Sequence, residues 1–322
     1  MSTDLETAPT MWALRAHTSG GPETLRYEEA PTPEPGTGDV LVRVHAASFT
    51  ATELEWPSTW TDRRGLDRTP VIPGHEISGV VVAQGWGTVA PAIGDEVIGL
   101  LDWYRDGGAA EYVTVEGHNL GPKPQSVDHA TAAAVPLAGL TAWQGLFDHG
   151  HLQAGQTVVV HGAGGGVGTY AVQLARNAGA RVIATGRAHA ADVAVDLGAD
   201  TFVDLDQLGD GPLGDAGTAD VVFDTVGGSV LARSWPLLRP GGRLISVAEP
   251  PSAPDDAQAA DVTALYFVVI PDRAQLTELS RLVDAGDLRV VVGASVPLRD
   301  GQSAWADKMA GGSSGKTVLQ IR

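Results

Sequence analysis

The sequence predicts an α/β fold in which a barrel-like, all-β domain is followed by a doubly wound parallel sheet. Three observations predict it. Short strands broken by Gly and Pro run from Met11 to Val127. Near Asp128 the sequence changes from strand-like to an Ala-rich, helix-like pattern, and from Thr157 onward strands alternate with helices. Alternation of the last kind is typical of a parallel sheet covered by helices on both faces.

Residue patterns place the individual elements. Val40–His45 and Gly79–Ala83 alternate as half-buried strands do, and the Ala-rich stretch His129–Gly145 is helix-like. The tail, Leu288–Arg322, is again β-like, with a Gly-Ser loop at Gly311–Gly315. In between, strands are expected at Thr157–His161, Arg181–Thr185, Asp220–Phe223, Arg243–Val247 and Tyr266–Ile270, and helices at Thr169–Ala178, His189–Leu197 and Arg273–Ala285.

Composition excludes several function classes. The formal net charge of −18 over 322 residues disfavours nucleic acid and anionic membrane surfaces as partners. The absence of cysteine excludes disulfides, thiolate nucleophiles and cysteine zinc ligands. Met1–Ala16 does not resemble a signal peptide, and the apolar stretch Val262–Pro271 is too short to span a bilayer. A cytoplasmic protein with a small-molecule substrate is expected.

A glycine-rich turn carries the strongest signal. His161–Gly168 lies between an expected strand and an expected helix, with glycines at 162, 165 and 168. Val167 occupies the last position of a strict GxGxxG counted from Gly162, so the spacing is GxxGxxG. Glycines let the backbone approach a pyrophosphate, and the helix that starts near Gly166 directs free N–H groups at it. The turn predicts a Rossmann dinucleotide site.

The end of the second strand indicates which dinucleotide binds. An NAD site needs a carboxylate there, but the sequence reads Ala184-Thr-Gly-Arg187, with no acidic residue before Asp192. Gly186 leaves room for a 2′-phosphate, and the Arg187 guanidinium can pair with it. NADP(H) is therefore favoured over NAD(H).

Several motifs together resemble the medium-chain dehydrogenase/reductase superfamily, in particular its zinc-independent, quinone oxidoreductase-like branch. They are Pro73–Gly79, Gly94–Val97, Ala110–Val113, Pro136–Ala142, the glycine turn, Phe223–Gly228, Gly241–Arg243 and Gly315–Leu319.

The resemblance implies a GroES-like domain that is interrupted by the Rossmann domain, with the active site in the cleft. The domains would be residues 1–130 (GroES-like, catalytic), 131–287 (NADP-binding) and 288–322 (return to the catalytic domain). It also implies that Thr141, Thr225 and Ala248 belong to the cofactor site. Many relatives dimerise through the edge of the Rossmann sheet. Tyr266–Ile270 could form that edge or equally an internal strand.

The same resemblance predicts that no metal is bound. Relatives that use zinc carry a cysteine where this chain has Thr50, and a histidine that matches His75. Their third ligand and their structural zinc loop have no counterpart, and Asp102–Ala109 is a short replacement. His75 with Glu76 cannot complete a zinc site.

Candidates for catalysis are few. Thr50 lies where many relatives place an Asn near the nicotinamide, and Tyr104 could line the cleft. Trp56 and Trp60 fall where relatives shape the substrate pocket, which would favour a flat, apolar substrate. For each of these four residues, ordinary packing or surface exposure is an equally good interpretation.

The function that follows is NADPH-dependent hydride transfer to a quinone or an α,β-unsaturated carbonyl. Such a reaction needs only donors for an enolate oxygen rather than a metal. Two alternatives remain open: a pathway-specific enoyl or ketone reductase acting on a polyketide-like substrate, and an NADPH-binding protein without turnover.

Overall fold

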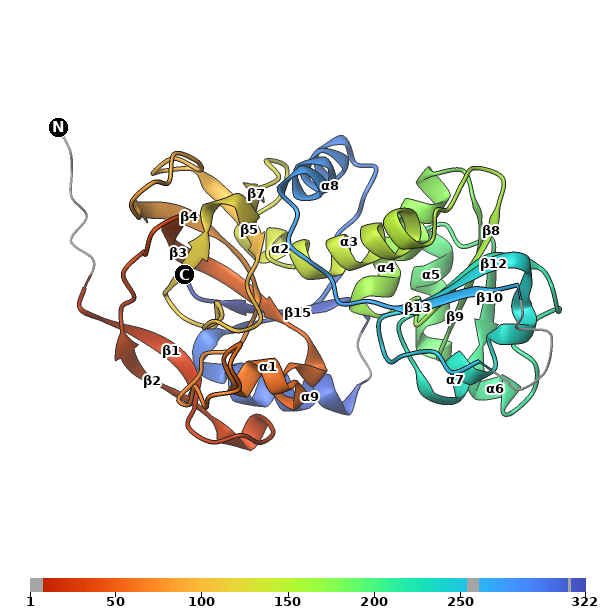
Figure 1. The fold of residues 1–322 in the computed structure, drawn as a ribbon, viewed down its shortest axis with the longest axis horizontal. Coiled ribbons are helices and arrows are strands. Elements are labelled where there is room, and N and C mark those ends of the chain that lie inside the picture. The colour runs from red at the N-terminus through yellow and green to blue at the C-terminus, as the bar shows by residue number, and fades with distance from the viewer. Residues whose placement is uncertain (1–7, 254–260, 312–313) are drawn as a thin grey trace. The chain divides into compact units, whose positions relative to one another are not determined.

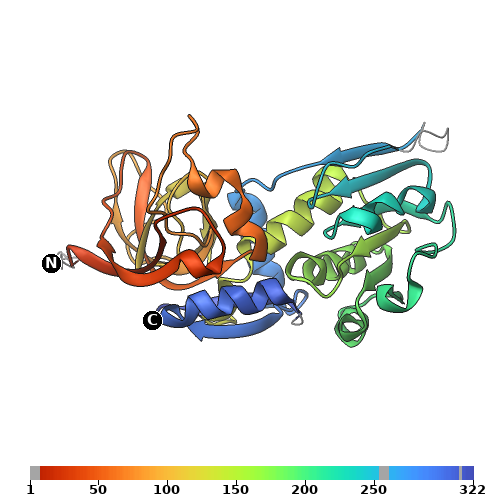
Figure 2. The same ribbon diagram turned by 90° about the horizontal axis from the view of Figure 1, so that it is seen from below.

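The computed structural model describes residues 8–253, 261–311 and 314–322, and its chain divides into two compact units (Figures 1 and 2). One unit comprises residues up to 137 with 271–284 and 292–322, and the other comprises 138–270 with 285–291. The expected domains, residues 1–130, 131–287 and 288–322, stay a prediction beside this division into units. Helix α8 (Arg273–Ala285) belongs mainly to the first unit, where Ser280 Oγ donates to Pro122 O at 2.7 Å.

The first unit is built on β-sheet. Its larger, seven-stranded sheet has the order β14-β15-β3-β4-β5-β7, with β6 paired to β3, and β1 pairs with β2. The strands are β1 (Thr10–Ala16), β2 (Leu25–Pro31), β3 (Asp39–Phe49), β4 (Glu76–Gln84), β5 (Glu96–Leu100), β6 (Tyr112–Glu116), β7 (Leu120–Pro122), β14 (Val292–Pro297) and β15 (Lys316–Gln320). Its other helices are α1 (Pro57–Trp60), α2 (His129–Ala132) and α9 (Gly301–Ala310).

The C-terminal strand joins the N-terminal part of the chain, as the resemblance implied. β15 pairs antiparallel with β3, so that Thr317 faces Phe49 and Gln320 faces Ala46 (Figure 1). Helix α9, however, was not expected in a β-like tail; Figure 2 shows it in dark blue near the C-terminus. It forms because Trp305 is fully buried and stacks on Phe49 at 3.9 Å between ring centroids. Part of the expected Gly311–Gly315 loop, and the first seven residues, lie outside the described residues.

The second unit contains a six-stranded, all-parallel sheet with the order β10-β9-β8-β11-β12-β13. The strands are β8 (Thr157–His161), β9 (Arg181–Gly186), β10 (Thr201–Asp204), β11 (Ala219–Asp224), β12 (Leu238–Ser246) and β13 (Thr263–Tyr266), and the helices are α3 (Pro136–Trp143), α4 (Gly166–Asn177), α5 (Ala191–Asp196), α6 (Leu205–Leu208) and α7 (Gly228–Ala232). The chain moves outward in one direction through β9 and β10, and in the other from β11. This confirms the doubly wound fold, with its switch point between β8 and β11.

Two expected elements differ in detail. The helix-like stretch 129–145 is broken into α2, α3 and a π-helical turn, Gln144–His149. The last strand of the parallel sheet is Thr263–Tyr266, so the expected strand Tyr266–Ile270 begins where β13 ends. The apolar residues that follow Tyr266 resemble a strand in sequence, but they run beyond the last paired residue of β12, Ser246.

Candidate active site

The glycine turn joins β8 to α4 and leaves no space for side chains at two positions. Gly162 has φ +76°, and a Cβ there would collide with Thr225 Oγ1. A Cβ on Gly168 would overlap the carbonyl oxygen of Gly162 and lie 2.7 Å from Ala163 Cα. Gly165 is the N-cap of α4 and has no side chain to satisfy the free N–H groups of the first turn. Those donors, from Gly166 onward, are therefore left for a ligand.

The other expected cofactor residues gather at the same edge of the sheet. Gly186 ends β9, Thr225 follows β11, and Ala248 lies two residues beyond β12. Because all strands are parallel, their carboxyl ends share one edge, which is where open α/β sheets bind ligands. Thr225 Oγ1 donates to the carbonyl of His161 at 2.8 Å and so braces the start of the glycine turn.

Arg187 follows β9 directly and is exposed. No carboxylate in the described part of the chain lies within ion-pair distance of its guanidinium. One acidic residue does lie next to this turn, since Asp206 Oδ2 accepts a hydrogen bond from Ala188 N at 3.4 Å. The Arg187 guanidinium therefore has no ion-pair partner, although the Asp206 carboxylate lies near the same turn. Thr141, the remaining cofactor candidate, is buried in α3.

His161 precedes the glycine turn and is completely buried, between Thr185 Oγ1 at 2.8 Å from Nδ1 and Ser234 Oγ at 3.0 Å from Nε2. Burial, with a smaller contribution from the charge of Arg233, lowers the pKa of His161 to about 3. The neutral imidazole links β8 to β9 and to the end of α7.

This burial predicts acid sensitivity. Between pH 6.5 and about 3 the unfolded chain binds a proton at His161 that the folded chain does not, so the free energy of unfolding decreases as pH falls in that window. The expected slope is about 1.4 kcal/mol per pH unit. Urea denaturation at several pH values should show a shallower pH dependence for His161→Gln than for the parent. Equal slopes in the two proteins would contradict the assignment.

In the first unit, Thr50 follows β3 directly and precedes a 3-10 turn, Ala51–Glu55. Its Oγ1 is buried and has no hydrogen-bond partner among the described residues. A buried hydroxyl without a partner costs free energy, roughly 1–3 kcal/mol, which a bound ligand would recover. The sequence prediction that Thr50 supplies a donor is therefore compatible with the structure.

Replacement of Thr50 by Val tests this interpretation, since Val keeps the shape and removes the hydroxyl. We expect the melting temperature to stay the same or rise slightly, because the change removes an unpaired buried polar group. Turnover of an accepted substrate should fall by roughly 10–100-fold, as for loss of one hydrogen bond to developing charge. Unchanged kcat in Thr50→Val would remove Thr50 from the catalytic machinery.

The other catalytic candidates are placed differently by the structure. The ring of Tyr104 is covered by the Arg63 guanidinium at 4.8 Å, and Arg63 pairs with Asp102 at 2.6 Å. Trp60 packs against the core of the first unit and donates its indole N–H to Leu54 O at 2.9 Å. These contacts favour the packing interpretation for Trp60. Trp56 is only half-buried and meets the edge of Trp103 at 5.2 Å.

Comparison with known proteins agrees with this geometry. Residues 36–125 match the model of the alcohol dehydrogenase GroES-like domain, and residues 191–319 match that of a zinc-binding dehydrogenase. The chloroplast envelope quinone oxidoreductase homolog of Arabidopsis thaliana is 30% identical over 94% of this chain and 95% of its own length. The chain belongs to the medium-chain dehydrogenase/reductase family.

Solved structures of this family place it further, in the quinone oxidoreductase-like branch of oxidoreductases. The quinone oxidoreductase from Coxiella burnetii matches with a TM-score of 0.87 and 27% identity, covering 97% of this chain and all of that one. A mycobacterial member solved in complex with NADPH matches with a TM-score of 0.81 and 28% identity over 97% of this chain and 100% of that chain. None of the described helices is both long and apolar enough to cross a membrane.

Zinc, which one family model is named for, does not fit the side chains present. His75 is buried, with Nδ1 at 2.5 Å from Glu53 Oε1 and Nε2 at 3.3 Å from Arg105 O, so neither ring nitrogen is directed at an open site. Glu76 is buried in an ion pair with Lys316 and also accepts a hydrogen bond from Leu137 N at 3.0 Å. No cluster of three potential ligands occurs within the described residues.

Sequence reasoning missed two buried acids, one in each unit, that fix the backbone and side chains around them. Glu53 is fully buried and accepts hydrogen bonds from His75 and from Gly74 N at 2.6 Å. Asp224, at the end of β11, accepts from Ser246 Oγ at 3.0 Å and from Gly227 N at 3.1 Å, and burial raises its pKa. Asp224 directly follows the apolar run Val221–Phe223, which is a signal that could have identified it, whereas Glu53 has polar neighbours in Thr52 and Glu55 and no such signal.

Proposed function

We propose that this oxidoreductase reduces a quinone or an α,β-unsaturated carbonyl compound with NADPH and without zinc. The observation that carries the proposal is the replacement of a metal-binding arrangement by the buried Glu53–His75 pair, with an unpaired buried hydroxyl on Thr50, whose main-chain carbonyl accepts Glu53 N at 3.0 Å. A substrate whose negative charge spreads over an enolate needs hydrogen-bond donors more than it needs a Lewis acid.

Different residues would bind the cofactor and the substrate. The N–H groups at the start of α4 and the Arg187 guanidinium would hold the pyrophosphate and the 2′-phosphate, respectively. NADPH, when bound, supplies the hydride. In the first unit Thr50 Oγ1 would donate a hydrogen bond to the substrate oxygen, and the half-buried indole of Trp56 would offer a flat apolar wall. Solvent would return the proton to the reduced product.

Cofactor preference follows from the end of β9. We expect NADPH to bind more tightly than NADH, and Arg187→Ala to remove most of that preference, since one charged hydrogen-bonding partner of a phosphate is worth roughly 1.5–3 kcal/mol. Asp206→Asn is the matched control with the opposite sign, because it removes the neighbouring negative charge and should strengthen NADPH binding. Fluorescence titration of each protein with both cofactors measures the effect. An NADH preference in the parent would contradict the prediction.

A panel of quinones and enones monitored at about 340 nm absorbance distinguishes the alternatives. Oxidation of NADPH with at least one acceptor supports the reductase. Tight NADPH binding without turnover of any acceptor would instead favour a sensor, or a pathway-specific reductase with a polyketide-like substrate. The cytoplasmic location stays a prediction, since the Arabidopsis relative is by name a chloroplast envelope protein.

We also propose that the protein forms a homodimer through the edge of its parallel sheet. β13 is the last strand of the parallel sheet, and its free edge continues into residues whose exposure alternates: Tyr266, Val268 and Ile270 are exposed, whereas Phe267 and Val269 are buried. Antiparallel pairing of the outer edge of β13 with a second copy would satisfy main-chain groups of Thr263–Tyr266 and cover those side chains, while the main chain of Ile270 stays bonded to Gln144. Sedimentation velocity of the parent and of Val268→Lys would test it, because a monomeric parent contradicts the proposal.

A further inference from the structure

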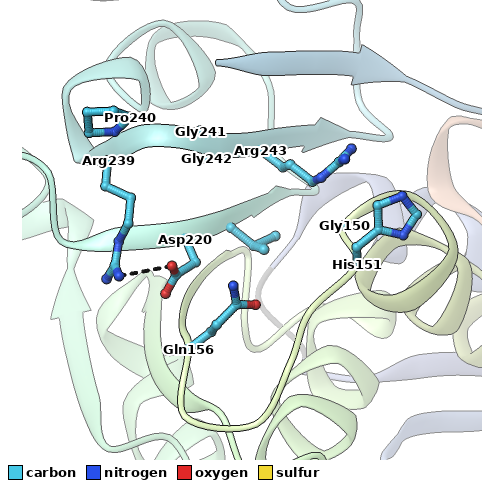
Figure 3. Close-up of a pocket in the computed structure, with 10 residues that line it drawn as sticks. Gly150, His151, Gln156, Asp220, Arg239, Pro240, Gly241, Gly242 and Arg243 are labelled. Carbon is cyan, nitrogen blue, oxygen red and sulfur yellow. Dashed lines mark ion pairs between the residues drawn. The ribbon is translucent and has the colours of Figure 1, made fainter. Parts of the chain in front are cut away.

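A cavity of about 240 Å³ lies at the amino-terminal edge of the parallel sheet, at the opposite ends of the strands from the glycine turn (Figure 3). Gln156 comes immediately before β8, Asp220 lies at the start of β11, and Arg239–Arg243 form the first half of β12. The cavity belongs entirely to the second unit and shares no residue with the expected cofactor site.

An irregularity in β12 creates this cavity. Leu238 pairs with Ala219 and Arg243 pairs with Val221, so that four residues of β12 lie opposite the single residue Asp220. The extra residues include Pro240, which has no N–H for the sheet, and Gly241 with φ +78°. Bulges of this kind are frequent beside binding sites, because they lift backbone away from the sheet and redirect side chains.

Two arginines line the cavity, and they differ in the hydrogen bonds and ion pairs that they form within the protein. Arg239 is fully engaged, since it pairs with Asp220 at 3.0 Å and donates to Thr218 O at 2.9 Å. The second carboxylate oxygen of Asp220 accepts Thr157 N at 2.7 Å. Arg243, which is half-buried, has one hydrogen bond, from Nη1 to His149 O at 3.3 Å, and no carboxylate within ion-pair distance in the described ranges. The positive charge of Arg243 is therefore left uncompensated.

Two further polar groups face the same space. His151 has φ +50°, a left-handed conformation that no other non-glycine residue in the described ranges adopts, and its Nδ1 bonds Phe147 O at 3.2 Å. The other ring nitrogen, Nε2, is therefore left for a ligand. Gln156 Oε1 accepts Gln153 N at 2.8 Å, which leaves the Nε2 amino group to donate. Figure 3 shows Arg243 and His151 on one side of the cavity and Gln156 below it.

We propose that this cavity binds a small phosphate-bearing anion, at a site separate from the dinucleotide. The guanidinium fork of Arg243 matches a phosphate, and the Gln156 amino group and His151 Nε2 line the same cavity from another segment, which suits a tetrahedral group better than a planar carboxylate. The volume is below the range of roughly 300–1,000 Å³ that accommodates drug-sized ligands, so the anion is of the size of a small phosphate monoester.

Calorimetric titration with inorganic phosphate and with glycerol 3-phosphate at low ionic strength tests the proposal. We expect saturable binding that Arg243→Gln weakens at least tenfold and that Arg243→Lys, which keeps the charge but not the fork, weakens less. Arg26→Gln, which removes an exposed arginine of the first unit, should bind as the parent does. Succinate, titrated in parallel, should bind more weakly than phosphate.

Arg187→Ala separates this site from the nucleotide edge. Phosphate binding that survives Arg187→Ala and is weakened in both Arg243 variants and in His151→Ala supports the proposal. Binding that is lost in Arg187→Ala but kept in Arg243→Gln, or no binding to the folded parent, overturns it. Melting temperatures of the variants show whether each one folds, and NADPH turnover reports separately on the proposed reductase.

Discussion

Gly168→Ala is expected to abolish useful cofactor binding. The added methyl group would overlap the carbonyl of Gly162 and approach Ala163 Cα, and because both are backbone atoms, neither can move aside by rotating. Helix α4 would have to shift away from β8 and carry its first-turn N–H groups out of position. Loss of two hydrogen bonds to a charged phosphate, at roughly 1.5–3 kcal/mol each, corresponds to a decrease in NADPH affinity of at least about a hundredfold.

The same substitution should lower the free energy of unfolding by about 1–3 kcal/mol, as overpacking does elsewhere. Gly214→Ala is the matched control in the same unit, because a Cβ at Gly214 would make an ordinary contact of 3.4 Å with Leu237. Titration with NADPH and urea denaturation measure both effects. Parent-like affinity in Gly168→Ala would mean that α4 does not hold the cofactor.

The buried ion pair between Lys316 and Glu76 should produce the largest stability effect. The two side chains are 5% and 0% exposed, and Lys316 Nζ also donates to Phe49 O at 3.0 Å. Glu76→Gln leaves the Lys316 ammonium group without its counter-charge. Lys316→Met leaves the Glu76 carboxylate without its counter-charge. Each single change should cost about 3–5 kcal/mol, because an uncompensated charge remains buried.

The double variant Glu76→Gln/Lys316→Met removes both charges and keeps an acceptor for Leu137 N. We expect it to be less destabilised than the sum of the single variants, with a coupling of roughly 0.5–3 kcal/mol. Glu278→Gln provides the exposed control, since Glu278 and Arg281 are 39% and 58% exposed and such pairs contribute at most about 1 kcal/mol. Strict additivity at Glu76 and Lys316 would show that the pair is not coupled.

Local sequence patterns were sufficient for the features that depend on neighbours in the chain. The strand, glycine turn and helix from Thr157 to Asn177 are contiguous, so periodicity and glycine spacing predicted the element types, while the nucleotide site at this edge stays a prediction. Helix α8 was predicted with its observed bounds, Arg273–Ala285, because it has a strong apolar periodicity.

Features that depend on distant residues could not be obtained in this way. Glu76 and Lys316 are 240 positions apart, and nothing in either segment indicates that they meet. Helix α9 is specified by the burial of Trp305 against Phe49 rather than by a periodic pattern. The β12 bulge arises from a shift in register with β11, a relation between two strands that neither strand contains by itself.

The pairing of β15 with β3 affects the order in which the protein can fold during synthesis. Thr317–Gln320 leaves the ribosome long after Ala46–Phe49, which is its neighbour in the sheet. The sheet of the first unit therefore stays incomplete until β15 has emerged, because β6 pairs only with the Asp39–Arg43 part of β3 and leaves Ala46–Phe49 for β15. All strands of the parallel sheet, by contrast, are available once Tyr266 has emerged, so the second unit can form its sheet while β3 still lacks β15.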